Sequence, residues 1–186
     1  AALKRRAHAK PRQKAKPLVS IVMPTRNHGH FIRESIDSVL SQSYPNVELI
    51  VMDGASTDDT VEILKSYGER IRWISEPDNG QADAINKGMG KVSGDILAYL
   101  NSDDILLPGA LEKVVDYFNE HPECDMVYGD ADYIDKDGYV TGQYVTAEFS
   151  FDRLMHDCCV CQPAAFWRRR AAERTGAFNA ELQTAM

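Results

Sequence analysis

The sequence predicts a single α/β domain with a mainly parallel sheet flanked by helices, and a mixed second half that contains a hairpin. Three observations support this fold class. The chain of 186 residues is long enough for one domain with a sizeable core and too short for two. Short apolar runs alternate with helical apolar stripes at a spacing of roughly 25 residues, as in crossover units of a parallel sheet. A tight-turn sequence between two β-rich runs marks the hairpin.

The predicted strands are short apolar runs without strict alternation, which is typical of strands covered on both faces. The first run, Leu18–Met23, is expected to stop at Pro24. The other predicted strands are Val47–Met52, Ile71–Ile74, Ile96–Leu100 and Met126–Tyr128. Right-handed crossovers would bring the loops after these strands to one edge of the sheet, where ligands bind in open α/β folds.

Helices are predicted between the strands from apolar stripes. Four stripes or segments define them, namely Ile32 with Ile36, Val39 and Leu40; Val61 with Ile63 and Leu64; Gln81–Met89; and Leu111 with Val114, Val115 and Phe118. Asp59 and Glu62 predict a capping box at the start of the second helix. Beyond residue 130, the turn Asp135–Gly138 lies between two β-rich pairs and predicts the hairpin.

Charge is distributed unevenly along the chain. The net charge is −7, yet seven of the 21 basic residues lie in the first 16 positions, which contain no acidic residue. The rest of the chain is therefore strongly acidic, and we expect no nucleic-acid partner because nucleic-acid affinity comes largely from lysine and arginine. We expect residues 1–16 to form a disordered basic linker and residues 17–186 to form the domain.

No membrane-spanning or secretory segment is predicted. The longest apolar runs are about a third of the ~20 residues that cross a bilayer, and no signal peptide opens the chain. The four cysteines lack the spacing of a disulfide framework, and Cys158 and Cys161 lack the second pair of a structural zinc site. We therefore expect a cytoplasmic protein, either free or peripheral to the inner face of the membrane. Because the chain begins at Ala1, we also expect it to be part of a longer protein.

Carboxylates follow four of the five predicted strands. The segments after the strands are Pro24–Asn27, Asp53–Gly54, Glu76–Asn79, Asn101–Asp104 and Gly129–Asp130. Carboxylates that share one crevice repel one another unless a cation lies among them, and Mg²⁺ or Mn²⁺ in such a place often also holds substrate phosphates. Any single aspartate could instead be a turn or capping residue. Their recurrence at strand ends favours a metal-bridged diphosphate site.

Other phosphate-binding and catalytic motifs are missing from the sequence. There is no G-x-x-x-x-G-K-[ST] segment, and Gly88-Met-Gly90 lacks the third glycine of a dinucleotide fingerprint. Asp135–Gly138 fits a hairpin turn better than a calcium loop, and no nucleophile elbow is present. Dinucleotide cofactors are therefore disfavoured.

Five segments, taken in order, carry a family pattern. They are Val19–Asn27, Ser38–Pro45, Val51–Asp58, Gly80–Gly88 and Leu100–Pro108. Together they resemble the inverting family 2 glycosyltransferases, which have the type A glycosyltransferase fold and its nucleotide-diphospho-sugar transferase sheet. The resemblance extends from about Pro17 to the end of the chain. Each segment alone is a weak signal, whereas five in order are specific.

The resemblance implies a binding site for a nucleotide-sugar donor, usually a UDP-sugar. The residues that it implies are Pro24, Thr25, Arg26, Asn27, Asp53, Gln81, Asp83, Lys87, Asn101 and Asp103. Asp53 would accept a ring N–H of the base. Asp83 and Lys87 would lie on the side of the base and the diphosphate. Asp103 aligns with the metal-binding carboxylate of the family's D-x-D motif, and Asn101 replaces the first aspartate of that motif.

The resemblance assigns no general base within this chain. Cys161–Arg168 and Gly176–Asn179 resemble the acceptor-side half of the family, in which an acidic pair follows and its aspartate takes the proton of the acceptor hydroxyl. No such pair occurs before Met186, and Glu181 alone does not match the pattern. We expect the base to lie beyond Met186, so that this chain binds donor but transfers sugar poorly.

The expected function is transfer of a sugar, with inversion, from a nucleotide-diphosphate donor to a hydroxyl of a glycan, a lipid-linked or a protein acceptor. Mg²⁺ or Mn²⁺ would stabilise the leaving diphosphate. Two alternatives remain. A nucleotidyltransferase would need a glycine-rich basic loop after the first strand, for which Pro24–Gly29 is a poor substitute. A non-catalytic nucleotide-sugar-binding module stays open because no base is assigned.

Overall fold

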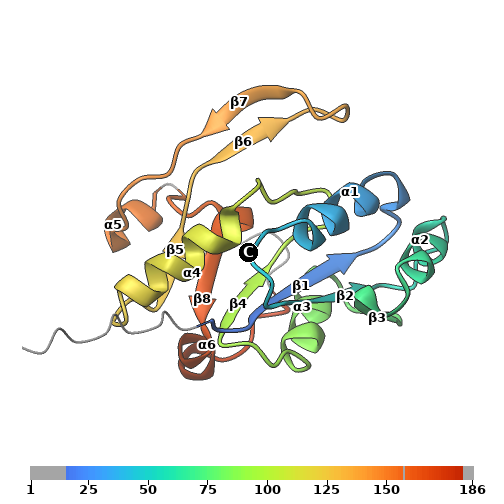
Figure 1. Cartoon of the computed structure of the whole chain (residues 1–186), viewed down its shortest axis with the longest axis horizontal. Helices are drawn as coiled ribbons and strands as arrows, with labels where there is room; N and C mark the ends of the chain where they lie inside the picture. Colours follow the sequence, from blue (N-terminus) through green and yellow to red (C-terminus); the bar gives the residue numbers. More distant parts are fainter. Residues whose placement is uncertain (1–15, 157, 182–186) are drawn as a thin grey trace, which may run out of the picture.

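A six-stranded sheet organises the protein, and a separate two-stranded hairpin lies beside it in the computed structural model, which describes residues 16–156 and 158–181 (Figure 1). The strand order is β3-β2-β1-β4-β8-β5. The sheet strands are β1 (Val19–Thr25), β2 (Val47–Asp53), β3 (Arg72–Ser75), β4 (Ile96–Tyr99), β5 (Met126–Tyr128) and β8 (Ala165–Arg168). β1 to β4 pair in parallel, whereas β8 is antiparallel to β4 and β5. The predicted mainly parallel sheet is confirmed.

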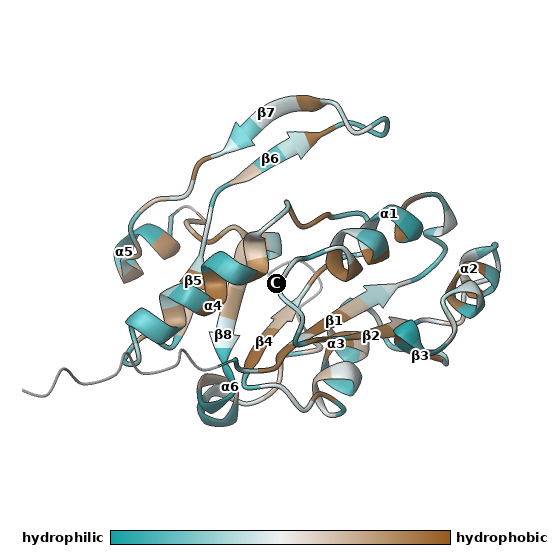
Figure 2. Ribbon diagram, in the orientation of Figure 1, coloured by the Kyte–Doolittle hydropathy of each residue, from teal (hydrophilic) through white to brown (hydrophobic). Residues whose placement is uncertain are grey.

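Helices cover both faces of the sheet because the central strands are apolar on both sides. Every residue of β1 is buried. On one face, Ile21 belongs to a core cluster with α1 (Gly29–Leu40), α2 (Thr60–Ser66) and α4 (Ala110–Glu120). On the other face, Val22 packs with α3 (Gln81–Met89). Figure 2 shows the central strands as hydrophobic ribbons, in contrast to the more hydrophilic hairpin tip.

Close packing of α3 on the sheet depends on Gly88. A Cβ at this position would lie 2.4 Å from Val22 Cγ1 and 3.0 Å from Met52 Cγ. No real Cβ approaches another heavy atom so closely, so a side chain would push the helix away from β1 and β2. The glycine therefore sets how near the last turn of α3 lies to β1 and β2.

β8 is the one strand of the sheet that the apolar pattern does not predict. It lies between β4 and β5, two strands that precede it in the chain, and three arginines follow its apolar residues. The guanidinium of Arg168 donates to the Cys124 and Phe118 carbonyls at 2.8 and 2.7 Å, and that of Arg169 donates to Gly94 O at 2.7 Å. These bonds attach β8 and the following helix α6 (Arg169–Thr175) to the sheet.

The predicted hairpin is confirmed. It consists of β6 (Ala131–Ile134) and β7 (Val140–Tyr144), which pair antiparallel across the turn. Asp135 Oδ1 accepts the N–H groups of Asp137 and Tyr139, and Gly138 adopts φ 82°. Three short helices complete the described chain, namely η1 (Gly68–Arg70), α5 (Phe151–Leu154) and η2 (Gln162–Ala164).

The predicted capping box at α2 is wrong. Asp59 is the N-cap residue, but its side chain makes no capping hydrogen bond. The preceding Asp58 takes that place, because its carboxylate accepts Thr60 N–H at 3.0 Å and Gly29 N–H at 3.0 Å. Asp58 thus joins the starts of α1 and α2, a contact that short-range sequence spacing does not reveal.

Most of the predicted linker, residues 1–15, lies outside the described residues. Lys16 and Pro17 are attached to the domain, since their carbonyl oxygens accept Asn46 Nδ2 at 2.9 Å and Tyr44 Oη at 2.6 Å. Among the residues that the structure describes, no helix combines the length and apolar character required to cross a bilayer.

Candidate functional site

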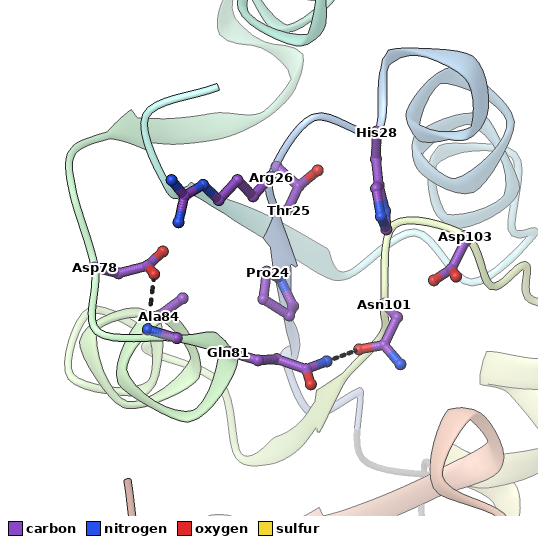
Figure 3. Close-up of a pocket in the computed structure, with 10 residues that line it drawn as sticks. Pro24, Thr25, Arg26, His28, Asp78, Gln81, Ala84, Asn101 and Asp103 are labelled. Atoms are coloured by element: carbon purple, nitrogen blue, oxygen red, sulfur yellow. Dashed lines mark hydrogen bonds between the residues drawn. The ribbon is translucent and has the colours of Figure 1, made fainter. Parts of the chain in front are cut away.

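A cavity of about 330 Å³ opens at the carboxyl ends of β1 and β4, beside the start of α3 (Figure 3). Six of the ten predicted site residues line it, namely Pro24, Thr25, Arg26, Gln81, Asn101 and Asp103. The residues His28, Asp78, Gly80 and Ala84 also line it and are not among the predicted ones. These four residues lie within or close to the polar segments that follow the strands. Their closeness to those segments in the sequence is the signal by which they could have been predicted.

Pro24 does not stop β1, contrary to the prediction. The strand continues to Thr25, and Pro24 stays in register with Met52 of β2. Pairing with β4 ends at Val22, whose carbonyl accepts Leu100 N–H at 3.0 Å. The backbone nitrogen of Pro24 points to the same side of β1 as the Val22 carbonyl, where the pairing with β4 has already ended. Its missing N–H therefore costs no hydrogen bond in the sheet.

Thr25 lines the cavity and carries a buried hydroxyl without a hydrogen-bond partner in the part of the chain that the structure describes. The residue is 6% exposed, and Oγ1 is the one buried side-chain oxygen or nitrogen without a hydrogen-bond partner among the described residues. A buried hydroxyl left unpaired costs about 1–3 kcal/mol. An unpaired group in the wall of a cavity fits a ligand that supplies the missing partner.

Arg26 and Asp78 lie on the same side of the cavity in Figure 3. Asp78 Oδ1 accepts Gly80 N–H at 2.9 Å, which holds the loop before α3. A Cβ on Gly54 would lie 2.4 Å from Asp78 Oδ2 and 3.4 Å from Arg26 Cδ. The glycine just after β2 leaves room for both side chains in the positions that they occupy.

His28 connects the loop after β1 to the loop after β4. Its Nδ1 lies 2.8 Å from Ser102 Oγ, and its backbone N–H donates to Thr60 Oγ1 at 3.1 Å. Ser102 is 1% exposed, so this contact is buried at its far end. The imidazole is thereby fixed in the wall of the cavity.

Asn101 and Asp103 belong to the loop after β4. Asn101 Oδ1 accepts Gln81 Nε2 at 2.5 Å across the cavity, as Figure 3 shows. Asp104 follows Asp103 in the chain. Burial, and to a lesser degree the charge of Asp103, raise the pKa of Asp104 to about 6, while the Asn101 side chain acts in the opposite direction. Of these two carboxyl groups, that of Asp103 lines the cavity.

Asn27 and Asp53 do not line the cavity but support its walls. Asn27 Oδ1 accepts Thr57 N–H at 2.8 Å, and Asn27 N–H donates to Ser56 Oγ at 2.7 Å. Asp53 is 2% exposed. Its Oδ2 accepts Ser56 N–H at 3.1 Å and Ser75 Oγ at 2.6 Å, while Oδ1 accepts the Ser56 hydroxyl. These bonds join the ends of β1, β2 and β3.

Asp83 and Lys87 also lie outside the cavity lining. Asp83 Oδ2 accepts Asn79 N–H at 2.9 Å and lies 3.1 Å from Lys87 Nζ. The backbone N–H of Asn79 and the Lys87 ammonium lower the pKa of Asp83. Lys87 Nζ donates to Pro77 O at 3.0 Å. Both side chains brace the loop that carries Asp78.

The oxygen ligands that the protein offers fit a cation that is held mainly by a substrate. Within the described ranges, no three His, Cys, Asp or Glu side chains lie close enough to hold a metal by themselves. Asp103 offers carboxylate oxygens in the cavity lining. Mg²⁺ and Mn²⁺ accept one or two carboxylates when substrate phosphates and water supply their other ligands. The residues therefore suit a hard divalent cation and do not form a closed metal centre.

Comparison with known sequences identifies similar proteins. The family model described as "Glycosyl transferase family 2" matches residues 20–176. An uncharacterized glycosyltransferase of Rickettsia felis is 31% identical over 183 residues, covering 90% of this chain and 30% of the relative. A PGL/p-HBAD biosynthesis glycosyltransferase of Mycobacterium tuberculosis is 32% identical over 170 residues, covering 89% of this chain and 64% of the relative. The chain thus spans less than two thirds of the length of either relative.

Solved structures share the fold. The mannosyltransferase PcManGT from Pyrobaculum calidifontis, in complex with GDP-Man and Mn²⁺, gives a TM-score of 0.69 at 22% identity and covers 90% of this chain and 49% of its own. S. aureus TarS 1–349, in complex with UDP-GlcNAc, gives a TM-score of 0.69 at 20% identity and covers 85% of this chain and 47% of its own. At these identities the likeness establishes the fold, and it confirms the predicted type of sheet.

Proposed function

The chain belongs to glycosyl transferase family 2, and on this premise we propose that its cavity binds the nucleotide-sugar donor of a sugar transfer to an acceptor hydroxyl. The observation that carries the proposal is the position of the cavity at the carboxyl ends of β1 and β4, with the unpaired Thr25 hydroxyl in its wall. The nucleotide sugars bound by PcManGT and TarS support this class of ligand.

The nucleoside occupies the side of the cavity formed by Pro24, Thr25 and Arg26 in this proposal, and a UDP-sugar is the proposed donor. Thr25 Oγ1 gains a hydrogen-bond partner from the ligand. Asp53 serves as the acceptor for a base N–H, because Oδ1 accepts a single hydrogen bond within the protein and a carboxylate oxygen can accept two. Asn27 keeps the two loops in place around the base.

The diphosphate lies toward Gln81, Asn101 and Asp103. Asp103 would hold Mg²⁺ or Mn²⁺, and when bound the cation offsets the charge that develops on the leaving diphosphate. Asp83 and Lys87 act indirectly by fixing the loop before α3. The reaction is proposed to be a direct displacement with inversion, and the acceptor to be a glycan, a lipid-linked molecule or a protein. No described residue is proposed as its general base.

A panel of nucleotides tests the proposal by calorimetry. We expect UDP to bind the wild-type chain in the micromolar range with Mn²⁺ and more than tenfold more weakly with chelator, and adenosine diphosphate to bind far more weakly. Tight binding of GDP in place of UDP would change the donor but keep the function. The absence of binding by any nucleotide or nucleotide sugar would contradict the proposal.

An activity assay separates the alternatives. Incubation with a sugar 1-phosphate and UTP would release pyrophosphate only if the protein were a nucleotidyltransferase. Binding of a UDP-sugar with neither hydrolysis nor transfer to any acceptor by the complete protein would favour a non-catalytic binding module. Release of UDP that depends on an acceptor hydroxyl is the result that we expect from the complete protein.

A further inference from the structure

Three side-chain amides form one continuous chain of hydrogen bonds that starts in the lining of the cavity, with Gln81 and Asn101. Gln81 Nε2 donates to Asn101 Oδ1 at 2.5 Å, and Asn101 Nδ2 donates to Gln162 Oε1 at 3.2 Å. Gln162 Nε2 then donates to the backbone carbonyl of Tyr99 at 2.8 Å. The three residues come from the start of α3, the loop after β4 and η2 before β8. The chain of bonds therefore connects the cavity to the late segment of the protein.

The direction of these bonds is fixed at one end. A backbone carbonyl can only accept, so the NH₂ group of Gln162 must face Tyr99 O and its Oε1 must face Asn101. Residue 101 must then donate toward Gln162, which leaves its Oδ1 to accept from Gln81. Position 101 thus needs a donor on one side and an acceptor on the other.

We propose that Gln162 is a positioning residue that orients the Asn101 amide for donor binding, and that this pairing requires asparagine at position 101. An aspartate there has no side-chain N–H, so it would present an oxygen to Gln162 Oε1. The pairing accounts for Asn101 at the place where the D-x-D motif begins with aspartate. The part of this inference that concerns ligand affinity rests on the proposed donor function, whereas the pairing itself does not.

A double-mutant cycle on Asn101 and Gln162 tests the inference. The variants are Asn101→Asp, Gln162→Met and the combination of both, each titrated with UDP and Mn²⁺ and each unfolded in urea. We expect Asn101→Asp to weaken UDP binding at least tenfold in the wild-type background. Because methionine removes the opposing oxygen, the same change should cost at least threefold less beside Gln162→Met. Equal penalties in both backgrounds would overturn the pairing.

A rescue variant distinguishes positioning from mere packing. In the combination of Asn101→Asp with Gln162→Lys, the ammonium can donate to both Tyr99 O and the new carboxylate, so UDP affinity should recover at least threefold over Asn101→Asp alone. A packing role predicts no recovery. Gln143→Met, on the exposed side of the hairpin, is the matched control and should leave affinity unchanged.

The unfolding data keep the two proposals separate. The hydrogen bonds exist without ligand, so the coupling between residues 101 and 162 should also appear as a change of at least threefold in the unfolding equilibrium constant. If the wild-type chain binds no nucleotide, the proposed donor function fails, and the unfolding cycle alone decides the pairing. If the wild type binds UDP and neither cycle shows coupling, the pairing fails and the donor function stands.

Discussion

Thr25 and Asp53 are register partners at the ends of the parallel strands β1 and β2. Both side chains are buried, at 6% and 2% exposure. Asp53 is held by Ser56 of the loop after β2 and by Ser75 at the end of β3, whereas Thr25 Oγ1 has no partner among the described residues. An oriented carboxylate and an unpaired hydroxyl thus lie on adjacent strands where the sheet meets the cavity.

Replacing Asp53 by asparagine should weaken uridine binding to a similar extent with and without metal. The amide NH₂ cannot accept the bonds that the carboxylate takes from Ser56 and Ser75, and a buried polar group left unpaired costs about 1–3 kcal/mol. Calorimetry with uridine, together with urea unfolding, measures both effects. Unchanged uridine affinity in a folded Asp53→Asn protein would remove Asp53 from the site.

Adding one methyl group at Gly88 should destabilise the fold, although alanine is the better helix former by about 1 kcal/mol. The added Cβ would collide with Val22 and Met52, and overpacking of this kind costs about 1–3 kcal/mol. Gly90→Ala is the matched control, because φ is −68° there and the nearest atom to a Cβ is 3.6 Å away. Urea unfolding should show a loss for Gly88→Ala and none for Gly90→Ala. The opposite order would contradict the close packing of α3.

Acid should remove a stabilising contribution of Glu48. Burial raises the pKa of Glu48, but hydrogen bonds from Ser20 and Ser93 and the charge of Arg72 outweigh it, so the net shift is downward. A lowered folded-state pKa gives stability that is fully present above the ordinary value of about 4.3 and is lost as the pH falls through the folded-state pKa.

Glu48→Gln should therefore be less stable than wild type at pH 7, with a difference that shrinks below about pH 4. Thermal unfolding across this pH range measures the difference. Glu34→Gln, on the exposed face of α1, is the control. A difference that is independent of pH would show that the Glu48 contacts do not depend on its charge.

Deleting residues 1–15 should leave UDP affinity within twofold of the full chain. The basic segment contains no acidic residue and no apolar pattern, and at 0.15 M salt its charges are screened beyond ~8 Å. The deletion starts the chain at Lys16, whose carbonyl is bonded to Asn46. A tenfold loss of affinity for the shortened chain would place the basic segment in the site.

The sequence alone predicts most strands of the sheet but not all of them. β1, β2 and β4 follow from apolar runs, because strands buried on both faces leave a strong local signal. β8 does not, because its place between β4 and β5 depends on contacts with residues that precede it by about 70 positions along the chain. The same reason explains why Asp58, and not the predicted Asp59, accepts a backbone N–H at the start of α2. Its carboxylate is also held by Gly29, which lies far from it in the sequence.

The site shows the same division. Thr25, Gln81, Asn101 and Asp103 are predicted from motifs and lie together in the cavity. His28 and Asp78 are not predicted, because their places depend on contacts with Ser102 and Gly80 and on the space beside Gly54. The predicted residues outside the lining, such as Asp83 and Lys87, hold the loops that form it.

Calorimetric titration of Asp103→Asn with UDP, in the presence of Mn²⁺ and of chelator, tests most directly the proposal that the cavity binds a metal-bridged nucleotide. Asp103 is the carboxylate of the loop after β4 that lines the cavity, and a neutral amide is a weaker ligand for a hard cation. Asp137→Asn, on the hairpin turn, is the matched control and should behave as wild type. We predict that Mn²⁺ strengthens UDP binding to wild type more than tenfold, about 1.4 kcal/mol, and that Asp103→Asn loses this gain while keeping its metal-free affinity. An undiminished effect of Mn²⁺ on the Asp103→Asn protein would contradict the account.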